Sequence, residues 1–481
     1  MDTEWQTRMS APPSCRWVAQ PNSFGGVLGV LCGLLCALVV CGTAAAGNLA
    51  APKSAVVESA SDIGLGHQER DILMVQPDLK RLVQSLKKLM LENGVHRDEA
   101  TGLPFYTGYK YLTLYDIDLY FEGIILYYVG ARDYTKNCIY LFLGMQKDNG
   151  LIPRTVQRRT ASWTNEENLE HCKPFLAQTA LFISQYEGDY SWITTEAFHR
   201  LRKYLNYWLD DCDRDGNGLS EWNSAPHAGA DNQFERVGGW QANYCEGADL
   251  NCYLYRECLA LAKIAAATGR AQQEVDLRRA AEARKEAIQH VLWDDKDKIF
   301  YDRDRRTGKP IKVKYLMSFM SLWAEVATRD QAEQSVNRYL TNPKEFWTPY
   351  PASTYARTEP SFAQVAKKGD YSPCNFRGSV WIPYNYWIMH GLKKYGFDKA
   401  AKEIAERSYD LLTLHPVPRE WYNSETGDGC GADPFWGFSC IAAFMPLELE
   451  HQCDPTALED AGLRDKIDKI REPVGTLDAE N

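Results

Sequence analysis

The stretch TEAFHRLRKYLNYWLDD (195–211) has the spacing of an amphipathic helix. Its large apolar residues recur every three or four positions, which places them on one face of a helix and leaves the charged residues on the other. They are Phe198, Leu201, Leu205 and Trp208. The stretch QPDLKRLVQSLKKLMLENG (76–94) repeats this spacing, and its terminal glycine is typical of a helix end. The pattern recurs almost without interruption after residue 76, so the sequence predicts an all-α fold.

Twelve segments carry this helical pattern. They lie at 76–92, 118–129, 133–147, 173–187, 194–210, 249–268, 275–293, 315–327, 330–341, 379–395, 397–413 and 435–449. Twelve helices with alternating short and long connections suit a ring of six helical hairpins, an (α/α)6 barrel with its long loops on one face. A helical solenoid is the alternative architecture, but the chain shows no repeat period. Function is expected in the long polar connections, at 148–172, 211–248, 342–378 and 414–434.

The composition narrows the class of partner. The net charge is −10, and no basic stripe interleaved with aromatic residues is present, which argues against a nucleic-acid partner. Aromatic residues make up 12% of the chain. Exposed aromatic rings stack on the apolar faces of sugars, although most of these rings are expected in a large core. The composition therefore favours a neutral or modestly charged substrate, such as a carbohydrate, and does not set an oligomeric state.

The N-terminal segment has the features of an export signal. Residues 24–46 are uncharged and apolar and end in small residues, with Ala44 and Ala46 placed as a cleavage site. This predicts an exported protein cleaved near Ala46; the alternative is a membrane anchor formed by 24–46, which is long enough to span a bilayer. The predicted organisation has four parts: a signal peptide or signal-anchor at 1–46, a linker at 47–75, the barrel domain at 76–450 and a C-terminal tail at 451–481.

The cysteines point to disulfides rather than to zinc. Ten of the fourteen cysteines follow the N-terminal segment, and they are scattered along the chain without the spacing of a zinc site. One or two disulfides suit an exported protein, but their pairing cannot be deduced from the sequence.

The stretch DCDRDGNGLSEW (211–222) opens like a calcium-binding loop. An EF-hand loop needs glycine at position 6 and a bidentate glutamate at position 12. In the two possible registers position 12 is Trp222 or Ser224, so the closing carboxylate is missing. We expect a tight acidic turn and no bound metal, with a structural calcium near Asp211–Asn217 as the open alternative.

Two acids in different long loops stand in suggestive settings. Asp231 lies in AGADNQF, and Glu420 lies in REWYNSETGDG. A pair of carboxyl groups can cleave a glycosidic bond, because one protonates the leaving oxygen while the other activates water or attacks the sugar. By spacing alone, each acid is better explained as a solvated or capping carboxylate.

A series of motifs changes that balance. In order along the chain they are LYDIDLYFEG, DNGLIPR, CKPFLAQTALFIS, DRDGNGLSEW, GADN, ADLNCYLYRECLALAKIA, VLWDDKDKIFYDRD, FRGSVWIPYNYWI and EWYNSETGDGCGADPFWGFSCIAAFM. Residues 76–449 thereby resemble glycoside hydrolase family 63, and in particular its mannosylglycerate-hydrolase-like catalytic domains. The last two motifs are the most specific.

The resemblance implies an (α/α)6 barrel that hydrolyses α-glucosides or α-mannosides with inversion and without a cofactor. The family's general acid lies in a G-x-D-N stretch, which here gives Asp231, and its general base lies in an E-x-Y-N stretch, which gives Glu420. An inverting pair stands about 6.5–9.5 Å apart so that a water molecule fits between them. The pKa of the acid has to be raised and that of the base kept low.

The resemblance also implies a set of substrate-binding residues. They are Asp118, Phe121, Asn232, Arg377, Gly378, Trp381, Tyr422 and Trp436. An arginine can hold a hydroxyl or carboxylate in its planar fork, and an indole can stack on a sugar ring. For the aromatic residues, plain core packing is an equally good reading.

Three departures from the family pattern put the substrate in doubt more than the reaction. Ser379 replaces the usual proline after Arg-Gly, Tyr115-Asp116 replaces a Trp-Asp pair, and 233–235 read Gln-Phe-Glu where the family has Ser-Pro-Arg. A negatively charged aglycone would need a cationic clamp. Arg154, Arg236 and Arg377 are the candidates, but the sequence does not show that they converge.

Two other functions remain open. A sugar isomerase or epimerase on an α/α barrel needs a basic pair such as two histidines, and nothing in the sequence pairs His171 or His227 with a suitable partner. Both histidines are better explained as structural. A non-catalytic carbohydrate-binding protein is the other alternative, and the acids retained in both motifs argue against it.

Overall fold

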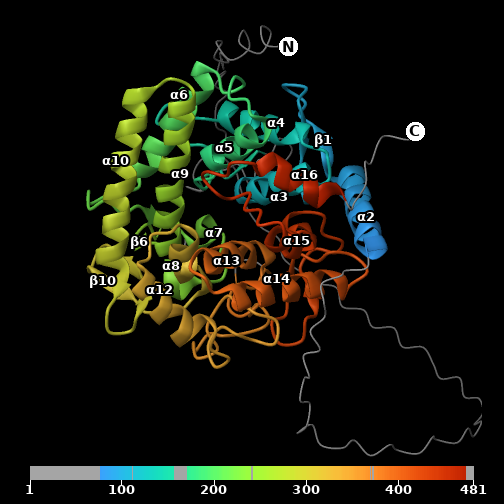
Figure 1. Cartoon of the computed structure of the whole chain (residues 1–481). Coiled ribbons are helices and arrows are strands. Elements are labelled where there is room, and N and C mark those ends of the chain that lie inside the picture. Colours follow the sequence, from blue (N-terminus) through green and yellow to red (C-terminus); the bar gives the residue numbers. More distant parts are fainter. Residues whose placement is uncertain are drawn as a thin grey trace, which may run out of the picture. The chain divides into compact units, whose positions relative to one another are not determined.

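The computed structural model describes residues 76–110, 112–156, 171–239, 242–368, 370 and 373–472. All of them belong to one compact unit, Met74–Asn481 (Figure 1). The predicted signal or anchor at 24–46 and the linker at 47–75 lie outside the described residues. Within the described ranges, no helix is both long and apolar enough to cross a membrane.

All twelve predicted helical segments are helical in the structure. The main helices are α2 (Gln76–Gly94), α3 (Asp116–Tyr128), α4 (Asp133–Gly144), α5 (Leu176–Glu187), α6 (Thr195–Asn206), α9 (Ala248–Ala267), α10 (Ala271–Ala287), α11 (Met320–Trp323), α12 (Arg329–Ser335), α13 (Ile382–Lys394), α14 (Asp398–Thr413) and α15 (Met445–Glu450). Three further helices were not predicted: α7 (Ala225–Ala228), α8 (Phe234–Val237) and α16 (Leu463–Arg471).

Several predicted helices begin or end in a tighter or wider turn. The 3-10 turns are η4 (Leu316–Phe319), which leads into α11, and η6 (Phe438–Ala443), which leads into α15. The π turns are η2 (Tyr207–Asp211), η3 (Ile288–Leu292) and η5 (Val336–Leu340), which extend α6, α10 and α12. These turns explain why the predicted ranges run past the α-helical ends.

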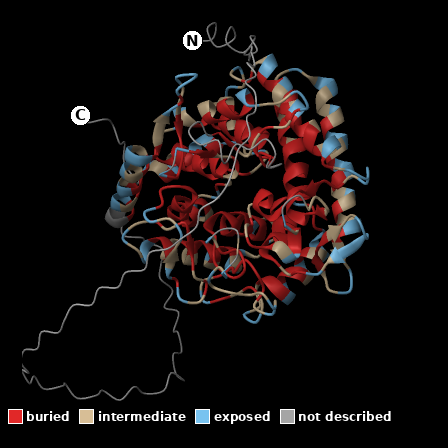
Figure 2. Ribbon diagram, turned by 180° about the vertical axis from the view of Figure 1, so that it is seen from behind, coloured by how far each residue is buried: buried red, intermediate tan, exposed pale blue. Residues whose placement is uncertain are grey.

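The helices fall into a buried set and an amphipathic set. Six elements form a closed series in which each contacts the next: α3, α5, α9, α11, α13 and η6. The last element, η6, contacts α3 and closes the series. The helices α4, α10 and α14 pack against α3, α9 and α13 respectively. Most residues of α3, α9 and α13 are buried, whereas α10 and α14 bury one face only, as expected of an inner and an outer layer. In Figure 1, α9 and α10 lie side by side, and Figure 2 shows buried residues in the interior and exposed ones on the outward sides.

Short antiparallel strands lie in the connections, so the fold is mostly helical rather than all-α. The strands are β1 (Val95–Arg97), β2 (Pro104–Tyr106), β3 (Leu114–Tyr115), β4 (Thr155–Val156), β5 (Glu221–Trp222), β6 (Cys245–Glu246), β7 (Trp293–Asp294), β8 (Ile299–Phe300), β9 (Asp302–Asp304), β10 (Lys309–Ile311), β11 (Trp421–Tyr422) and β12 (Gly429–Cys430). One sheet has four strands in the order β10-β9-β6-β5, and the others are pairs. Two or three residues are too few to show an alternating pattern, which is why the sequence did not reveal them.

An aromatic cluster fills the centre of the buried helices, as the composition predicted. Phe175 stacks on Trp387 with ring centroids 5.3 Å apart, and Trp323 lies 5.2 Å from Trp387. Tyr120 and Tyr253 contact the same tryptophan. Rings from α3, α5, α9, α11 and α13 thereby meet in one core.

The C-terminal residues 451–472 are packed rather than a tail. Helix α16 contacts α3 and α5 and buries Leu463, Ile467 and Ile470. Ahead of it, Thr456 accepts a hydrogen bond from Trp323 Nε1 at 2.9 Å. The C-terminal segment is therefore part of the packed domain.

No disulfide joins any two of the ten cysteines in the described part of the chain. Eight of these cysteines are buried, and Cys374 and Cys430 are half-buried. The expectation of one or two disulfides is therefore not met, because most of the cysteines serve as small apolar side chains of the core.

Candidate active site

Asp231 follows a turn that the sequence shapes closely. Ser224 caps α7 by accepting a hydrogen bond from the His227 backbone N–H at 3.1 Å. Gly229 then adopts a φ of +69°, a left-handed conformation that favours glycine. The chain turns there, and Asp231 lies half-buried just beyond it.

Asn232 ties this turn to the loop that precedes α13. Its side-chain oxygen accepts a hydrogen bond from the Phe376 N–H at 2.9 Å, and its amide donates to Asn375 Oδ1 at 3.2 Å and to Asp370 Oδ2 at 3.3 Å. Asn232 is fully buried. These bonds fix the turn on which the neighbouring Asp231 lies, and a contact of Asn232 with a substrate stays a prediction.

Glu420 is held immediately before β11 with only 8% of its surface exposed. Its Oε2 accepts a hydrogen bond from the Ala432 N–H at 2.9 Å, and its Oε1 accepts one from the Tyr109 hydroxyl at 3.1 Å. Gly431 has a φ of +74°, and a Cβ there would lie 2.5 Å from Oε2. Glycine is required at 431 both for the turn and for the space that the carboxylate occupies.

The electrostatics of Glu420 differ from the sequence-based expectation. Burial raises the pKa of Glu420 above its usual value, the negative charge of Asp231 raises it further, and the hydrogen bonds from Ala432 and Tyr109 oppose this rise. The expected low pKa is not found, because burial outweighs the two donors. The effect of Asp231 on Glu420 means that the two acids lie within electrostatic range of each other in the folded chain.

A pocket of about 710 Å³ opens at Glu420. Besides Glu420 itself, two segments line it: the connection before α13 contributes Val365, Lys367, Lys368, Asp370 and Cys374, and the β11–β12 region contributes Trp421, Cys430 and Ala432. Both lysines are exposed at its rim. The pocket is large enough for a small ligand.

The predicted Arg377, Gly378 and Trp381 lie beside this pocket. The Arg377 guanidinium donates to Asp370 Oδ2 at 2.5 Å, so the buried arginine is committed to an acid of the pocket lining. Trp381 stacks on Phe376 at 4.0 Å and lies nearly parallel to Trp421 at 6.4 Å. The backbone N–H of Gly378 donates to Thr354 Oγ1 at 2.9 Å.

Asp118 lies in the first turn of α3 with 5% of its surface exposed. Burial raises the pKa of Asp118 to about 7; the charges of Asp116 and Glu420 also raise it, and Lys173 and Arg154 lower it. Asp118, Glu420 and Asp231 therefore form a linked group of acids contributed by three distant parts of the chain.

The three remaining predicted residues are buried. Phe121 is fully enclosed and packs against Trp387, with ring centroids 4.7 Å apart. The Tyr422 hydroxyl accepts a hydrogen bond from the Arg419 N–H at 3.2 Å. Trp436 donates from Nε1 to the Thr107 carbonyl at 2.9 Å. In this structure the contacts of these rings are with other groups of the protein, and their contact with a substrate stays a prediction.

Sequence reasoning missed Tyr109, Asp370, Cys374 and Asn375. Tyr109 donates to Glu420, Cys374 Sγ lies 3.9 Å from Glu420 Oε1, and Asp370 receives both Arg377 and Asn232. These residues come from connections without regular structure. No spacing in the chain could have indicated them, because their proximity arises only when the loops converge.

The three candidate clamp arginines do not converge. Arg236 is buried and donates to Asp302 and, at 2.7 Å, to Asp249. Arg154 donates to the Pro226 carbonyl at 2.7 Å, and Arg377 binds Asp370. Each guanidinium is bound by a different group of the protein, and only Arg377 is bound to an acid of the pocket lining.

The two histidines form a pair, contrary to the sequence-based expectation. The rings of His171 and His227 lie 4.6 Å apart, and His171 Nε2 lies 3.0 Å from the Tyr207 hydroxyl. Burial lowers the pKa of His171 to about 3 and that of His227 well below its usual value. His227 also stacks on Trp208 at 5.3 Å. The pair is a neutral, enclosed part of the core rather than a basic pair open to a sugar.

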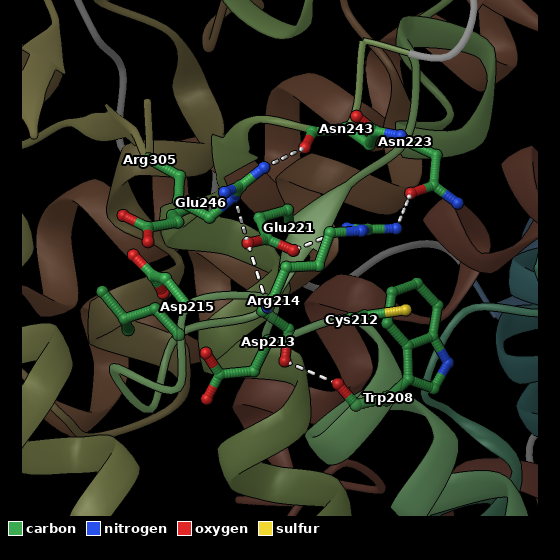
Figure 3. A network of polar contacts seen from close by, with 12 residues as sticks. Trp208, Cys212, Asp213, Arg214, Asp215, Glu221, Asn223, Asn243, Glu246 and Arg305 are labelled. Carbon is green, nitrogen blue, oxygen red and sulfur yellow. Dashed lines mark hydrogen bonds and ion pairs between the residues drawn. The ribbon is translucent and has the colours of Figure 1, made fainter. Parts of the chain in front are cut away.

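The acidic loop after α6 is shaped by hydrogen bonds and ion pairs, among them those from Arg214 to Glu221 and Asn223 (Figure 3). Asp213 accepts the backbone N–H groups of Asn217 at 3.0 Å and Gly218 at 2.8 Å, which forms the predicted tight turn. The nearest group of possible metal ligands is Asp215, Glu221 and Glu246.

Arginines compensate those carboxylates. Arg214 and Arg305 lie 2.6 and 2.8 Å from Glu221, and Arg303 lies 2.6 Å from Glu246. Three guanidinium groups balance three carboxylates, so the cluster offers a cation no net negative charge. The alternative of a calcium ion near Asp211–Asn217 gains no support from this arrangement.

Comparison with known proteins identifies the family. Residues 116–436, more than half of the chain, match the family described as Mannosylglycerate hydrolase MGH1-like glycoside hydrolase domain. A mannosylglycerate hydrolase of Rubrobacter radiotolerans is 30% identical over 173 residues, 35% of this chain and 37% of that protein. A cytosolic neutral trehalase of Kluyveromyces lactis is 29% identical over 138 residues, 29% of this chain and 18% of that protein. These matches span well under two thirds of either relative.

Solved structures agree at the level of fold. The GH63 mannosylglycerate hydrolase of Thermus thermophilus, solved in complex with glucose, has a TM-score of 0.58 at 17% identity, covering 76% of this chain and 99% of that one. Neutral trehalase from Saccharomyces cerevisiae has a TM-score of 0.56 at 16% identity, covering 81% and 82%. The family model matches residues 116–436, and the sequence motifs and the helical fold agree with it. The chain therefore belongs to the MGH1-like glycoside hydrolase family.

Proposed function

We propose that this protein hydrolyses a short α-glucoside or α-mannoside with inversion at the anomeric carbon, Asp231 being the general acid and Glu420 the general base. One observation carries the proposal: Glu420 lines a pocket, and the charge of Asp231, from a distant loop, is near enough to raise the pKa of Glu420. Two acids flanking a space for sugar and water are the machinery of inverting hydrolysis.

In the proposed reaction the Asp231 carboxyl donates its proton to the glycosidic oxygen as that bond breaks. Glu420 takes a proton from a water molecule, which attacks the anomeric carbon from the opposite face. The Ala432 N–H and the Tyr109 hydroxyl fix the Glu420 carboxylate, so that its orientation does not depend on the substrate. Proton transfer and an enclosed water suffice for this chemistry.

We also propose that the helices form an (α/α)6 barrel. The support is the order of neighbours: α3, α5, α9, α11, α13 and η6 contact one another in sequence and η6 returns to α3, while α4, α10 and α14 pack outside. A closed inner layer of this kind collects its loops at one end, which would bring the segments of Asp231 and Glu420 together.

The rim of the pocket favours a substrate with an anionic aglycone. Lys367 and Lys368 line the pocket of Glu420 and are exposed, so they are available to a carboxylate. The named activities of the relatives, mannosylglycerate hydrolase and trehalase, differ in this respect, since glycerate is charged and trehalose is not. We therefore place an α-mannosyl or α-glucosyl conjugate of a small hydroxy acid ahead of a neutral disaccharide.

The proposed location is outside the cytoplasm, after cleavage near Ala46, with anchoring by residues 24–46 as the alternative. The support is the apolar segment and its small-residue end. The mass of the protein recovered from its natural host tests this directly: a chain beginning near Gly47 supports cleavage, and one that retains 24–46 contradicts it.

The test of function is time-resolved proton NMR of the full chain with α-mannosyl and α-glucosyl conjugates of glycerate, and with trehalose. Early appearance of the β-anomer from an α-linked substrate supports inverting hydrolysis and names the sugar. Early α-anomer means retention and contradicts the assigned roles. Binding without turnover across the panel would favour a carbohydrate-binding protein instead.

A further inference from the structure

Helix α3 carries a second buried acid behind Asp118. Asp118 and Glu122 are four residues apart, so they lie one above the other on the same face of the helix. Glu122 is 1% exposed, Asp118 is 5% exposed, and the substrate roles discussed above do not involve Glu122. Two adjacent carboxyl groups in a low-dielectric interior cannot both ionise at low cost.

The space around Glu122 is built to hold a carboxyl group. Gly108 and Gly437 border it: a Cβ at Gly108 would collide with Oε1, and a Cβ at Gly437 would lie 2.9 Å from it. Trp436, next to Gly437, is held by the Thr107 carbonyl, so this wall is also a wall of the candidate site. Neither oxygen of Glu122 has a hydrogen-bond partner among the described residues.

The titratable groups that face Glu122 are neutral or acidic. Tyr106 approaches from β2, Cys138 from α4 and Cys440 from η6, and the pKa of each is raised in part by the charge of Glu122. Burial and Asp118 raise the pKa of Glu122, and only the nearby backbone N–H of Gly108 lowers it. Among the described residues, no cation is positioned to stabilise an ionised Glu122.

Asp118 faces a different set of charges. Lys173, from the segment before α5, and Arg154, from the loop after α4, favour its ionised form, whereas Asp116 and Glu420 disfavour it. The two cations act on Asp118 and not on Glu122. A single negative charge on this pair is therefore most stable on the acid nearer to the site.

We propose that Asp118 and Glu122 hold one proton between them at neutral pH, that this proton resides on Glu122, and that it keeps Asp118 ionised beside Glu420. Glu122 is then a positioning residue, since it touches no substrate and acts through Asp118. No direct hydrogen bond joins the two acids, both within the described part of the chain, so in this proposal the O–H of Glu122 acts on Asp118 through one buried water molecule. The effect on turnover rests on the proposed function, but the place of the proton does not.

The first test is infrared difference spectroscopy of the full chain, comparing the wild type with Glu122→Gln at neutral pH. The carbonyl band of a protonated carboxylic acid is expected in the wild type and is lost in the variant, and it persists in the matched variant Glu92→Gln at an exposed site of α2. A band that is unchanged in Glu122→Gln would mean that Glu122 is a carboxylate in the wild type, and it overturns the proposal.

The second test uses the coupling of the two acids. In Asp118→Asn the neighbouring charge is gone, so the band of Glu122 should disappear at a lower pH than in the wild type. A band that titrates at the same pH in both proteins contradicts a shared proton. This measurement also serves if one of the variants proves poorly folded, because either comparison alone decides the question.

Kinetics separate this inference from the proposed function. Glu122→Gln copies the protonated acid, so kcat/KM near neutral pH should change by no more than about threefold, whereas Glu122→Leu should lose more and shift the pH profile. A large loss in Glu122→Gln with unchanged thermal stability would mean that an ionised Glu122 is needed. Failure to hydrolyse any glycoside would overturn the proposed function and leave the infrared result standing.

Discussion

The candidate site and the four-stranded sheet region differ in how their buried carboxylates are compensated: arginines pair with them in the sheet region, and uncharged donors hold Glu420 in the candidate site. In the four-stranded sheet region, Glu221, Glu246 and Asp302 each lie within 2.6 Å of an arginine nitrogen. In the candidate site, Glu420 and Asp118 have no such ion pair among the described residues, and Glu420 is held by a backbone N–H and a phenol.

That difference separates structural acids from candidate working acids. A buried carboxylate that only supports the fold is best compensated fully, since an unpaired buried charge is costly. A carboxyl group that must gain or lose a proton needs an environment in which both states are accessible. The absence of ion pairs at Glu420 and Asp118 within the described chain, rather than their burial, distinguishes them.

The largest expected effect is on turnover in the candidate site. Asp231→Asn and Glu420→Gln should each lower kcat by about 10²–10⁴-fold, because each removes a proton-transfer group while conserving its shape. Steady-state kinetics with the substrate found by NMR, together with thermal unfolding, check this. Near-normal turnover in either variant would remove that residue from the mechanism.

In the region where arginines pair with the buried carboxylates, a substitution is expected to lower stability rather than turnover. Arg236→Met leaves Asp249 and Asp302 without their common partner and should lower the free energy of unfolding by about 3–5 kcal/mol. Chemical denaturation measures it. The matched control is Arg279→Met, whose exposed ion pair with Asp276 at 3.7 Å should contribute under about 1 kcal/mol. Equal losses in both variants would contradict the contrast drawn between buried and exposed pairs.

Two glycines with a positive φ, Gly431 beside Glu420 and Gly188 in open surroundings, test whether the fit around Glu420 matters for turnover. Gly431→Ala should displace the Glu420 carboxylate and lower kcat by roughly 10–100-fold. Gly188→Ala has a similar φ of +66° but no neighbour within 4 Å, so it should cost only about 1–2 kcal/mol of stability and leave turnover unchanged. If both variants retain full turnover, the close fit of Gly431 against Glu420 has no catalytic importance.

A pH-dependent effect of moderate size is expected at Asp118. The pKa of Asp118 is raised to about 7, above its ordinary value near 4, so the folded state binds more protons than the unfolded state between these values. Stability should therefore fall as pH rises from about 4 to about 7, and this loss should be smaller in Asp118→Asn. Thermal unfolding across that range measures it, and parallel curves for the two proteins would contradict the raised pKa.

The smallest expected effect concerns calcium. Because arginines neutralise Glu221 and Glu246, neither calcium nor a chelator should shift the melting temperature of the full chain. A clear rise with calcium would mean that the acidic loop binds the ion after all. The control is Asp213→Asn, which should abolish any such rise if the ion sits in the predicted turn.

The helical periodicity of the apolar residues predicted most of the helices correctly, but it did not predict the short strands. The twelve segments with apolar spacing are all helices, since burying one stripe of side chains against neighbours decides both pattern and structure. The strands of two or three residues were missed because they are too short to show a pattern, whereas α16 was missed although Leu463, Ile467 and Ile470 keep the helical spacing.

For the candidate site, the motifs led to Asp231, Glu420 and Asp118, and the structure brings them into electrostatic contact. Loop convergence adds Tyr109, Cys374 and Asp370, which no local pattern marks. It also pairs His171 with His227, which the sequence did not suggest.

The sequence by itself determined the helices and the family, because these depend on local spacing and on short motifs, and from the same motifs it predicted the acids of the site. Only the tertiary structure decided which acid has an arginine and which has none among the described residues, where Glu122 lies, and why the pKa of Glu420 is raised rather than lowered. Burial and charge pairing are properties of the whole packing, since each sums over groups from many loops.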